Sequence, residues 1–263
     1  MTTEWDAGSY ERVSEPQVEW GRAVLARIPL RGDEDVLDAG CGTGRVTRLI
    51  AERVPRGSVV GVDASAAMVD EAARRLADLA PRVRVRRTDL LELELDPPVD
   101  LVVSTATFHW ILDHERLFAR LHAALRPGGR LVAQCGGAGN IAGTLAAAGV
   151  VGTGPRYAAY LDGLPPRWAF PDPAATERRL AAAGFADARA WLEEAPARFD
   201  DAALAAEFLA TVVLRCHLER LPEELRTPFA REVAARRTDP DGRVRIDYVR
   251  LNLQARRPED GAP

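Results

Sequence analysis

Short apolar runs alternate with amphipathic stretches through the first half of the chain. Apolar or alternating runs bounded by turn formers predict strands at residues 35–40, 58–63, 82–89, 99–105 and 130–135. Between them, residues 45–54, 65–80 and 113–125 repeat apolar side chains at helical spacing, and Ser65 and Asp113 are placed to cap two of the predicted helices. Because strand–helix–strand units repeat, we predict a parallel α/β sheet with helices on both faces.

The pattern changes after residue 135. Residues 136–154 are small and apolar, whereas later segments predict a helix at 174–185, strands at 186–199 and 242–256, and two helices between 200 and 237. We therefore predict an N-terminal lid or helical segment (1–34), a ligand-binding core (35–135) and a remainder (136–263) that completes the sheet. Within that remainder, residues 136–171 and 200–237 are expected to form a helical substrate cap.

Composition narrows the class of protein. The 263 residues are 47% hydrophobic and 28% charged, which is typical of a globular protein. The chain has neither an eighteen-residue apolar run nor an N-terminal signal pattern, so we expect a cytoplasmic protein without membrane attachment. The three cysteines, Cys41, Cys135 and Cys216, are too far apart to predict a disulfide framework or a metal pair.

The chain contains no lysine, so all 35 basic residues are arginine. There is therefore no Schiff-base lysine and no P-loop lysine, which makes pyridoxal-phosphate enzymes and Walker-type kinases or ATPases poor candidates. The net charge of −4 without a basic cluster also argues against a nucleic-acid partner and favours a small-molecule one.

A glycine-rich turn follows the first predicted strand. Its glycines have the spacing Gly40-x-Gly42-x-Gly44, and Arg45 stands where a dinucleotide-binding loop has its third glycine. Such a turn exposes backbone N–H groups at the carboxyl edge of a sheet, where open α/β sheets bind ligands. Asp38 lies two residues before the first glycine, and its carboxylate favours a positively charged ligand over a pyrophosphate.

The stretch VLDAGCGTG resembles the first motif of class I S-adenosylmethionine-dependent methyltransferases. VVGVDAS, RRTDLLEL, PVDLVVSTATFHWI and LRPGGRLV follow in that family's order, and the resemblance is strong over residues 35–135. FHWILDH together with LRPGGRL is similar to the trans-aconitate methyltransferase-like branch. The resemblance implies a Rossmann-like, doubly wound, mostly parallel seven-stranded sheet, S-adenosyl-L-methionine as cofactor, and S-adenosyl-L-homocysteine as product.

The family's cofactor contacts map onto particular positions of this chain. The resemblance implies that the methionine end meets Asp38, the backbone of Gly40, Cys41 and Gly42, the carbonyls of Ser104 or Thr105, and Gln17. Asp63 would accept from both ribose hydroxyls, Ala64 and Met68 would flank the adenine, and Asp89 and the Leu90 N–H would contact its edge. Gly44 either contributes to this loop or only allows close helix packing, and Asp38 could instead merely cap a loop.

His109 is the candidate catalytic residue, either as a base or as an orienting hydrogen-bond donor, and its alternative role is as a polar residue packed beside Trp110. His114, His122 and His217 are expected on the surface or on helix faces. Trp5, Tyr10 and Ser14 would belong to the lid, and arginines of the cap (Arg156, Arg167 and Arg215) could bind an acidic substrate.

The function expected is methyl transfer to a small molecule, on the oxygen of a carboxylate or hydroxyl. Two alternatives remain: a nicotinamide-dependent oxidoreductase, and a cofactor-binding protein of the same fold that acts as a cyclase or partner module. The sequence leaves the acceptor and the oligomeric state open, and no metal is expected.

Overall fold

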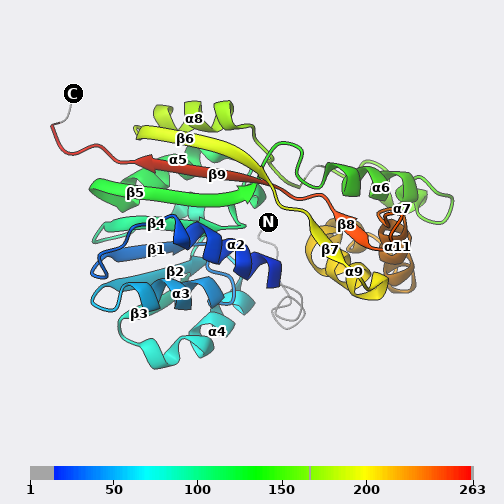
Figure 1. Ribbon diagram of the computed structural model, residues 1–263, viewed down its shortest axis with the longest axis horizontal. Coiled ribbons are helices and arrows are strands. Elements are labelled where there is room, and N and C mark those ends of the chain that lie inside the picture. The colour runs from blue at the N-terminus through cyan, green and yellow to red at the C-terminus, as the bar shows by residue number, and fades with distance from the viewer. Residues whose placement is uncertain (1–14, 166, 262–263) are drawn as a thin grey trace. The chain divides into compact units, whose positions relative to one another are not determined.

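A computed structural model describes residues 15–165 and 167–261 (Figure 1). The described chain divides into two compact units. The first comprises the residues up to Ala138, Ala169–Leu192 and the residues from Leu251 onward, and the second comprises Gly139–Trp168 and Glu193–Arg250. Trp5, Tyr10 and Ser14 lie outside the described residues. Gln17 lies in helix α2 (Glu15–Ala26), but its side chain is not among those described.

The first unit is built on a seven-stranded sheet with the order β3-β2-β1-β4-β5-β9-β6. β1 pairs in parallel with β2 and β4, so that Leu37 faces Val60 on one side and Val102 on the other. β3 and β5 extend this parallel block on its two sides. The strands are β1 (Asp35–Ala39), β2 (Ser58–Asp63), β3 (Val83–Arg87), β4 (Val99–Thr105), β5 (Leu125–Gly136), β6 (Ala186–Glu194) and β9 (Val249–Arg256).

Helices cover both faces of this sheet, which confirms the predicted doubly wound, Rossmann-like arrangement (Figure 1). α2, α3 (Arg45–Arg53) and α4 (Ala66–Arg75) share one hydrophobic cluster, and α5 (His114–Ala124) and α8 (Pro173–Ala182) share the other. Successive strand residues point to opposite faces, so Val36 joins the first cluster and Leu37 the second. Because both faces are covered, β4 has three consecutive apolar residues, Leu101 to Val103, where a sheet with one exposed face would alternate apolar and polar ones.

Short 3₁₀ turns and side-chain caps define the ends of these helices. The turns are η1 (Ala77–Leu79), η2 (Leu90–Glu92) and η3 (Phe108–Trp110). The Ser65 hydroxyl accepts from the Met68 N–H, and the Asp113 carboxylate accepts from the Arg116 N–H. Both predicted N-caps are therefore confirmed.

Two strands predicted as continuous are each divided in the structure. The first breaks after β6, where Ala195 and Pro196 separate it from β7 (Ala197–Phe199), because proline has no N–H to donate to a ladder. The second breaks between β8 (Val244–Ile246) and β9, where the Tyr248 N–H bonds to the Ile246 carbonyl two residues earlier. β7 and β8 then form a separate antiparallel pair.

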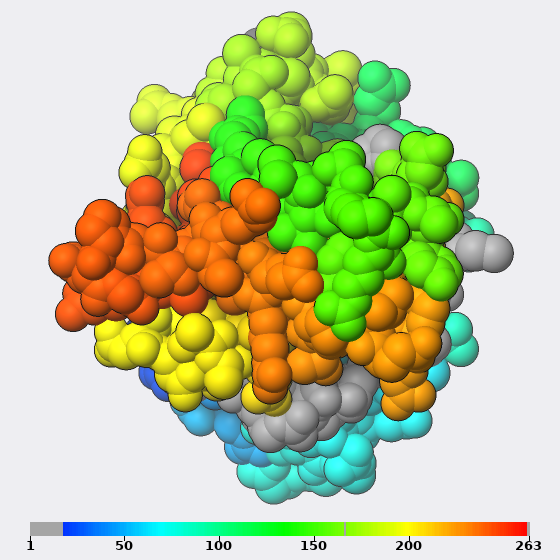
Figure 2. Space-filling view, turned by 90° about the vertical axis from the view of Figure 1, so that its right-hand side faces the viewer, coloured from blue at the N-terminus to red at the C-terminus, as the bar shows by residue number. Residues whose placement is uncertain are grey.

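The second unit packs helices around an aromatic core. Its helical elements are α6 (Ala142–Gly152), α7 (Ala158–Leu161), α9 (Ala202–Phe208), the π-helical turn η4 (Leu209–Val213), α10 (Arg215–Leu218) and α11 (Glu223–Ala235). α6 (green in Figure 2) packs against α11 (orange). Tyr157 and Phe229 meet edge to face at 5.1 Å, and the Tyr157 hydroxyl donates to Glu232. Asp247 accepts from the Gly143 and Thr144 N–H groups and so caps the start of α6.

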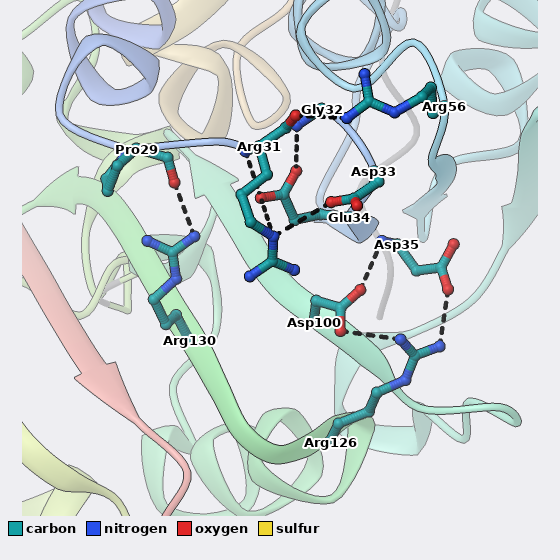
Figure 3. A network of polar contacts seen from close by, with 10 residues as sticks. All are labelled: Pro29, Arg31, Gly32, Asp33, Glu34, Asp35, Arg56, Asp100, Arg126 and Arg130. Carbon is teal, nitrogen blue, oxygen red and sulfur yellow. Dashed lines mark hydrogen bonds and ion pairs between the residues drawn. The ribbon is translucent and has the colours of Figure 1, made fainter.

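At the amino ends of β1 and β4, Arg126 holds two carboxylates together (Figure 3). Its guanidinium donates to Asp35 Oδ2 at 2.7 Å and to Asp100 Oδ1 at 2.9 Å, and the Asp35 N–H donates to Asp100 Oδ2 at 2.8 Å. A hydrogen bond from Ser58 and the charge of Arg126 hold the pKa of Asp35 below its usual value. This network locks the two central strands at the edge opposite the glycine turn.

We expect Arg126→Met to lower the free energy of unfolding by about 1 kcal/mol at pH 7, a modest loss because roughly a third of each side chain is exposed. A carboxylate whose pKa is lowered by folding stabilises the protein at pH values above its unfolded-state pKa, and this stabilisation disappears as the pH falls. The stability lost on substitution of Arg126 should therefore become smaller below about pH 4. Urea unfolding at pH 7 and pH 3.5 measures it. Arg22→Met, which breaks an exposed helical pair with Glu19, is the control and should change stability by less than about 0.5 kcal/mol. A loss of equal size at both pH values would contradict the prediction.

Candidate active site

The glycine turn joins β1 to α3 and is tied to the neighbouring strand. The Gly40 and Cys41 N–H groups both donate to the Val62 carbonyl, at 2.8 and 2.9 Å, and the Gly44 N–H donates to the Cys41 carbonyl at 3.0 Å. Gly40, Gly42 and Gly44 have φ angles of +87°, +53° and +80°. Side chains are strongly disfavoured in this left-handed region, which explains the three glycines.

The three glycines differ in what surrounds them. A Cβ on Gly40 would overlap the Thr107 hydroxyl and lie 2.6 Å from Thr107 Cβ, and one on Gly44 would lie 2.9 Å from Leu76 Cδ1. At Gly42, by contrast, no heavy atom of the described residues lies within 4 Å of an added Cβ. Gly40 and Gly44 therefore allow close packing within the protein, whereas Gly42 borders open space.

Asp38, at the end of β1 before this turn, is buried and only 1% exposed. The Thr47 hydroxyl donates to Asp38 Oδ2 at 2.6 Å. Burial and, to a lesser extent, the negative charge of Asp63 raise the pKa of the Asp38 carboxyl to about 7, against the lowering effect of the Thr47 hydrogen bond. Asp38 is therefore a carboxyl whose ionised form needs a nearby positive charge.

Asp63 ends β2 and faces the glycine turn. Its Oδ2 accepts from the Gly42 N–H at 3.0 Å, and its Oδ1 accepts from the Ser65 N–H at 2.9 Å. A carboxylate has about four lone-pair sites, so these bonds fix its orientation and leave each oxygen able to accept again. Met68, on the first turn of α4, is 3% exposed.

Asp89 lies at the end of the next strand. Its Oδ1 accepts from the Leu91 N–H at 2.9 Å and so caps η2, and Leu90 is buried. The Thr88 N–H donates to the Asp63 carbonyl at 2.9 Å, which ties the ends of β2 and β3 together. Arg87, which the sequence did not single out, is the register partner of Asp63, and its Nε donates to the Ala64 carbonyl at 3.1 Å.

The end of β4 closes the other side of the turn. The Ser104 hydroxyl donates to the Ala39 carbonyl at 2.6 Å. Ala106 has a left-handed φ of +56°, and the Thr107 hydroxyl lies 3.1 Å from the Thr105 carbonyl and 3.3 Å from the Gly40 carbonyl. β1 and β4 are the strands between which the strand order reverses, the place where open α/β sheets bind ligands.

His109 lies in η3, the 3₁₀ turn that follows β4, and is only 9% exposed. The Gly136 N–H donates to its Nδ1 at 3.3 Å, and its backbone carbonyl accepts from the Ala169 N–H at 2.9 Å. Its ring lies 5.3 Å from that of Trp110 and stacks on that of Phe170 at 6.0 Å.

Of the two positions expected for His114, the surface or a helix face, the structure shows the second: His114 is the first residue of α5 and is 5% exposed. Its Nε2 is 2.9 Å from the Phe108 carbonyl, which satisfies the buried ring. Burial lowers the pKa of His114. His122 and His217 are partly exposed.

The arginines proposed for an acidic substrate each contact a carboxylate of the second unit. Arg156 lies 3.6 Å from Glu232, and Arg167 and Arg215 lie 3.8 and 2.9 Å from the same residue, Glu219. Their charges are thus partly offset inside the protein.

Two absences hold for the described part of the chain. No described helix is both long enough and apolar enough to cross a membrane. Within the same residues, no group of three or more histidine, cysteine or acidic side chains is arranged to hold a metal ion.

Comparison with known proteins shows that this chain is similar to methyltransferases. A methyltransferase domain model matches residues 36–129. The trans-aconitate 2-methyltransferase of Methylobacterium nodulans is 33% identical over 270 residues, which cover 97% of this chain and 98% of that enzyme. The enzyme of the same name from Variovorax paradoxus is 39% identical over 132 residues, about half of each chain.

Solved structures show the same fold. Haemonchus contortus phosphoethanolamine N-methyltransferase 2, in complex with S-adenosyl-L-methionine, has a TM-score of 0.62 at 19% identity, over 96% of this chain and 57% of that longer one. YcgJ from Bacillus subtilis has a TM-score of 0.62 at 17% identity, over 91% and 97% of the two chains. The [4+2]-cyclase SpnF has a TM-score of 0.59 at 20% identity, over 92% and 82%, and at that identity shows the fold alone.

Proposed function

This chain belongs to the class I S-adenosylmethionine-dependent methyltransferases, in their trans-aconitate methyltransferase-like branch, and we propose that it methylates a carboxylate oxygen of a small polycarboxylic acid. Its cofactor is S-adenosyl-L-methionine and its acceptor a small molecule. The oxidoreductase and the non-transferring alternatives receive no support from the relatives. The observation that carries the carboxylate acceptor is the end-to-end match to a trans-aconitate 2-methyltransferase.

The residues at the carboxyl edge of the sheet fit this cofactor. Gly42 borders open space with a left-handed backbone, so a ligand can lie against the turn where a side chain would stand. Asp63 is bonded to the Gly42 N–H, Asp38 lies near enough to Asp63 for that charge to raise its pKa, and Asp38 ionises more readily when a cation is near. A ligand that carries an ammonium and two ribose hydroxyls matches this donor and acceptor set.

In this proposal, each end of the cofactor has its own contacts. Asp38 receives the ammonium, and the backbone of Gly40, Cys41 and Gly42 lines the methionine end. Carbonyls of Ser104 or Thr105 complete that end. Gly44 shapes the turn by allowing it to pack on α4.

The nucleoside end is assigned to the neighbouring strand ends. Asp63 accepts from both ribose hydroxyls with the lone pairs that Gly42 and Ser65 leave available. Ala64 and the buried Met68 flank the adenine, and Asp89 and the Leu90 N–H contact its edge. The bond from the Thr88 N–H to the Asp63 carbonyl supports this set, because it holds the two strand ends side by side.

The cofactor supplies an electrophilic methyl group on a positively charged sulfur. The protein aligns the acceptor with that methyl group and keeps water away, and effects of this kind reach about 7–11 kcal/mol. A carboxylate is already ionised at neutral pH, so it needs no base, whereas an alcohol would have to lose a proton.

We expect purified protein with methyl-labelled cofactor to convert trans-aconitate or a related di- or tricarboxylate into a methyl ester. Mild alkali should release the label as methanol, since esters hydrolyse under conditions that leave ethers and methylamines intact. Matched compounds in which the carboxylate is replaced by an alcohol or an amine serve as controls. Alkali-stable label in the product, or preference for the alcohol or amine, would contradict the proposal.

A further inference from the structure

The ring of His109 is held so that its two nitrogens have different roles. The Gly136 N–H, on the last residue of β5, donates to Nδ1 at 3.3 Å. A backbone N–H can only donate, so Nδ1 must present its lone pair to it. Neutral imidazole carries one N–H, and in this arrangement that proton is on Nε2.

Two further contacts fix the ring in this orientation. Phe170 stacks on it at 6.0 Å with an interplanar angle of 30°, and Trp110 lies beside it at 5.3 Å. The Ala169 N–H donates to the His109 carbonyl, so the segment that carries Phe170 is attached to the backbone of η3. Turning the ring by 180° would put the Cδ2–H group in the place of Nδ1 and break the Gly136 bond, and moving the proton to Nδ1 would set two N–H donors against each other.

His109 also stands close in sequence and space to the proposed cofactor turn. Thr107, two residues earlier, bonds to the Gly40 carbonyl at the end of β1. η3 therefore follows the strand end where the methyl donor is expected, which is where an acceptor group must lie.

We propose that His109 orients the acceptor by donating a hydrogen bond from Nε2–H to its carboxylate, and that it does not act as a base. Nε2 already holds a proton, and the Nδ1 lone pair is engaged by Gly136. This assignment rests on the proposed function and deepens it, because it restricts the acceptor to groups that are already ionised.

The transfer balances without a proton acceptor. A lone pair of the carboxylate oxygen forms the new O–CH₃ bond while the S–CH₃ bond breaks and its electron pair stays on sulfur. The carboxylate loses its negative charge, and the sulfur loses its positive charge. No proton leaves the acceptor, so a hydrogen-bond donor is sufficient.

Two substitutions separate a donor from a base and from a packing residue. His109→Gln keeps an N–H donor and an oxygen that can accept from Gly136, but cannot act as a base, whereas His109→Leu keeps only apolar volume. We expect the glutamine variant to retain kcat/KM within about 5-fold and the leucine variant to lose about 10–100-fold, the range for a hydrogen bond to a charged group. Both should bind S-adenosylhomocysteine with wild-type affinity by calorimetry. His122→Leu, which alters a histidine of α5 away from the site, should leave turnover unchanged.

Equal loss in the glutamine and leucine variants would overturn the donor role in favour of a base. Wild-type turnover in the leucine variant, or loss of product binding in it, would overturn it in favour of packing. Nitrogen-15 NMR of the histidine rings provides a readout independent of any acceptor. It should show His109 protonated at Nε2 and not at Nδ1, and the opposite tautomer would refute the inference even if ester formation is confirmed. If no ester forms but the Nε2 proton is seen, the proposed acceptor has failed while the tautomer holds.

Discussion

Replacing Asp38 by asparagine is expected to make the cofactor-free protein more stable at pH 8 and, at the same time, nearly unable to bind cofactor. Burial raises the pKa of Asp38 in the folded protein well above that of an exposed aspartate, to about 7. A raised pKa means that its contribution to stability is present below about pH 4 and is lost as the pH rises through 7. At pH 8 the wild type must bury a charge, whereas asparagine is neutral and its amide oxygen can still accept from Thr47.

The difference between this pKa and that of an exposed aspartate corresponds to at most about 4 kcal/mol, and we expect the asparagine variant to gain about 2–4 kcal/mol in stability at pH 8. At pH 4 the two proteins should differ little. Affinity for S-adenosylhomocysteine should fall about 50–100-fold, because its ammonium loses the carboxylate opposite it. Urea unfolding at both pH values and calorimetry with the product measure the two effects.

Asp70→Asn is the matched control, since it makes the same chemical change at an exposed position of α4. It should alter neither stability nor affinity appreciably. If Asp38→Asn were the less stable protein at pH 8, the raised pKa would be wrong. If it bound product with full affinity, the assignment of Asp38 to the ammonium would be wrong.

The two opposing effects are those expected of a ligand-binding carboxyl rather than of one with a structural role. Asp38 is buried, has one hydroxyl partner and lies near the charge of Asp63, so in the free protein the ionised carboxyl is unfavourable. A bound cation removes that penalty. At neutral to alkaline pH the ligand-free protein is therefore less stable than it would be with a neutral residue at position 38. In the proposed function, the ionised form of Asp38 serves only to bind the ligand.

The sheet and its helices were predictable because their signals are local. Leu117, Phe118 and Leu121 repeat at helical spacing and do enter one core cluster. Ser65 and Asp113 stand directly before helices and do cap them. Such features depend on residues within four positions of each other, which periodicity and capping rules describe.

The partners of the site residues were not predictable, because they depend on strand order and register. Thr47 bonds to Asp38 from a helix, and Thr107, in the segment between β4 and η3, bonds to the Gly40 carbonyl from 67 residues away in sequence. Nothing local marks either threonine. The burial of His114 was not predictable for a related reason: a polar ring satisfied by a backbone carbonyl has the same sequence pattern as an exposed one.

The contact between Thr107 and Gly40 leads to the second large effect, which is expected from Gly40→Ala. An alanine there must adopt φ near +87° and places its Cβ 2.6 Å from Thr107 Cβ, closer than two such atoms can lie. The left-handed backbone and the overpacking together should lower the free energy of unfolding by about 2–5 kcal/mol. Because the turn must shift, product affinity should fall as well. Denaturant unfolding and calorimetry measure both losses.

Alanine substitutions at two other glycines distinguish the effect of backbone strain from the loss of ligand contact. Gly163→Ala in the second unit has a similar φ of +65° and no described atom within 4 Å of the new Cβ, so it should show only the conformational cost of about 1 kcal/mol and full product affinity. Gly42→Ala should be about as stable as Gly163→Ala but should bind product poorly, because its Cβ enters the space assigned to the cofactor. In the Gly40→Ala background, Thr107→Gly should recover part of the lost stability by removing the atom that clashes. Full product affinity in Gly42→Ala would show that the open space beside the turn is not where the cofactor lies, whatever Gly40→Ala does.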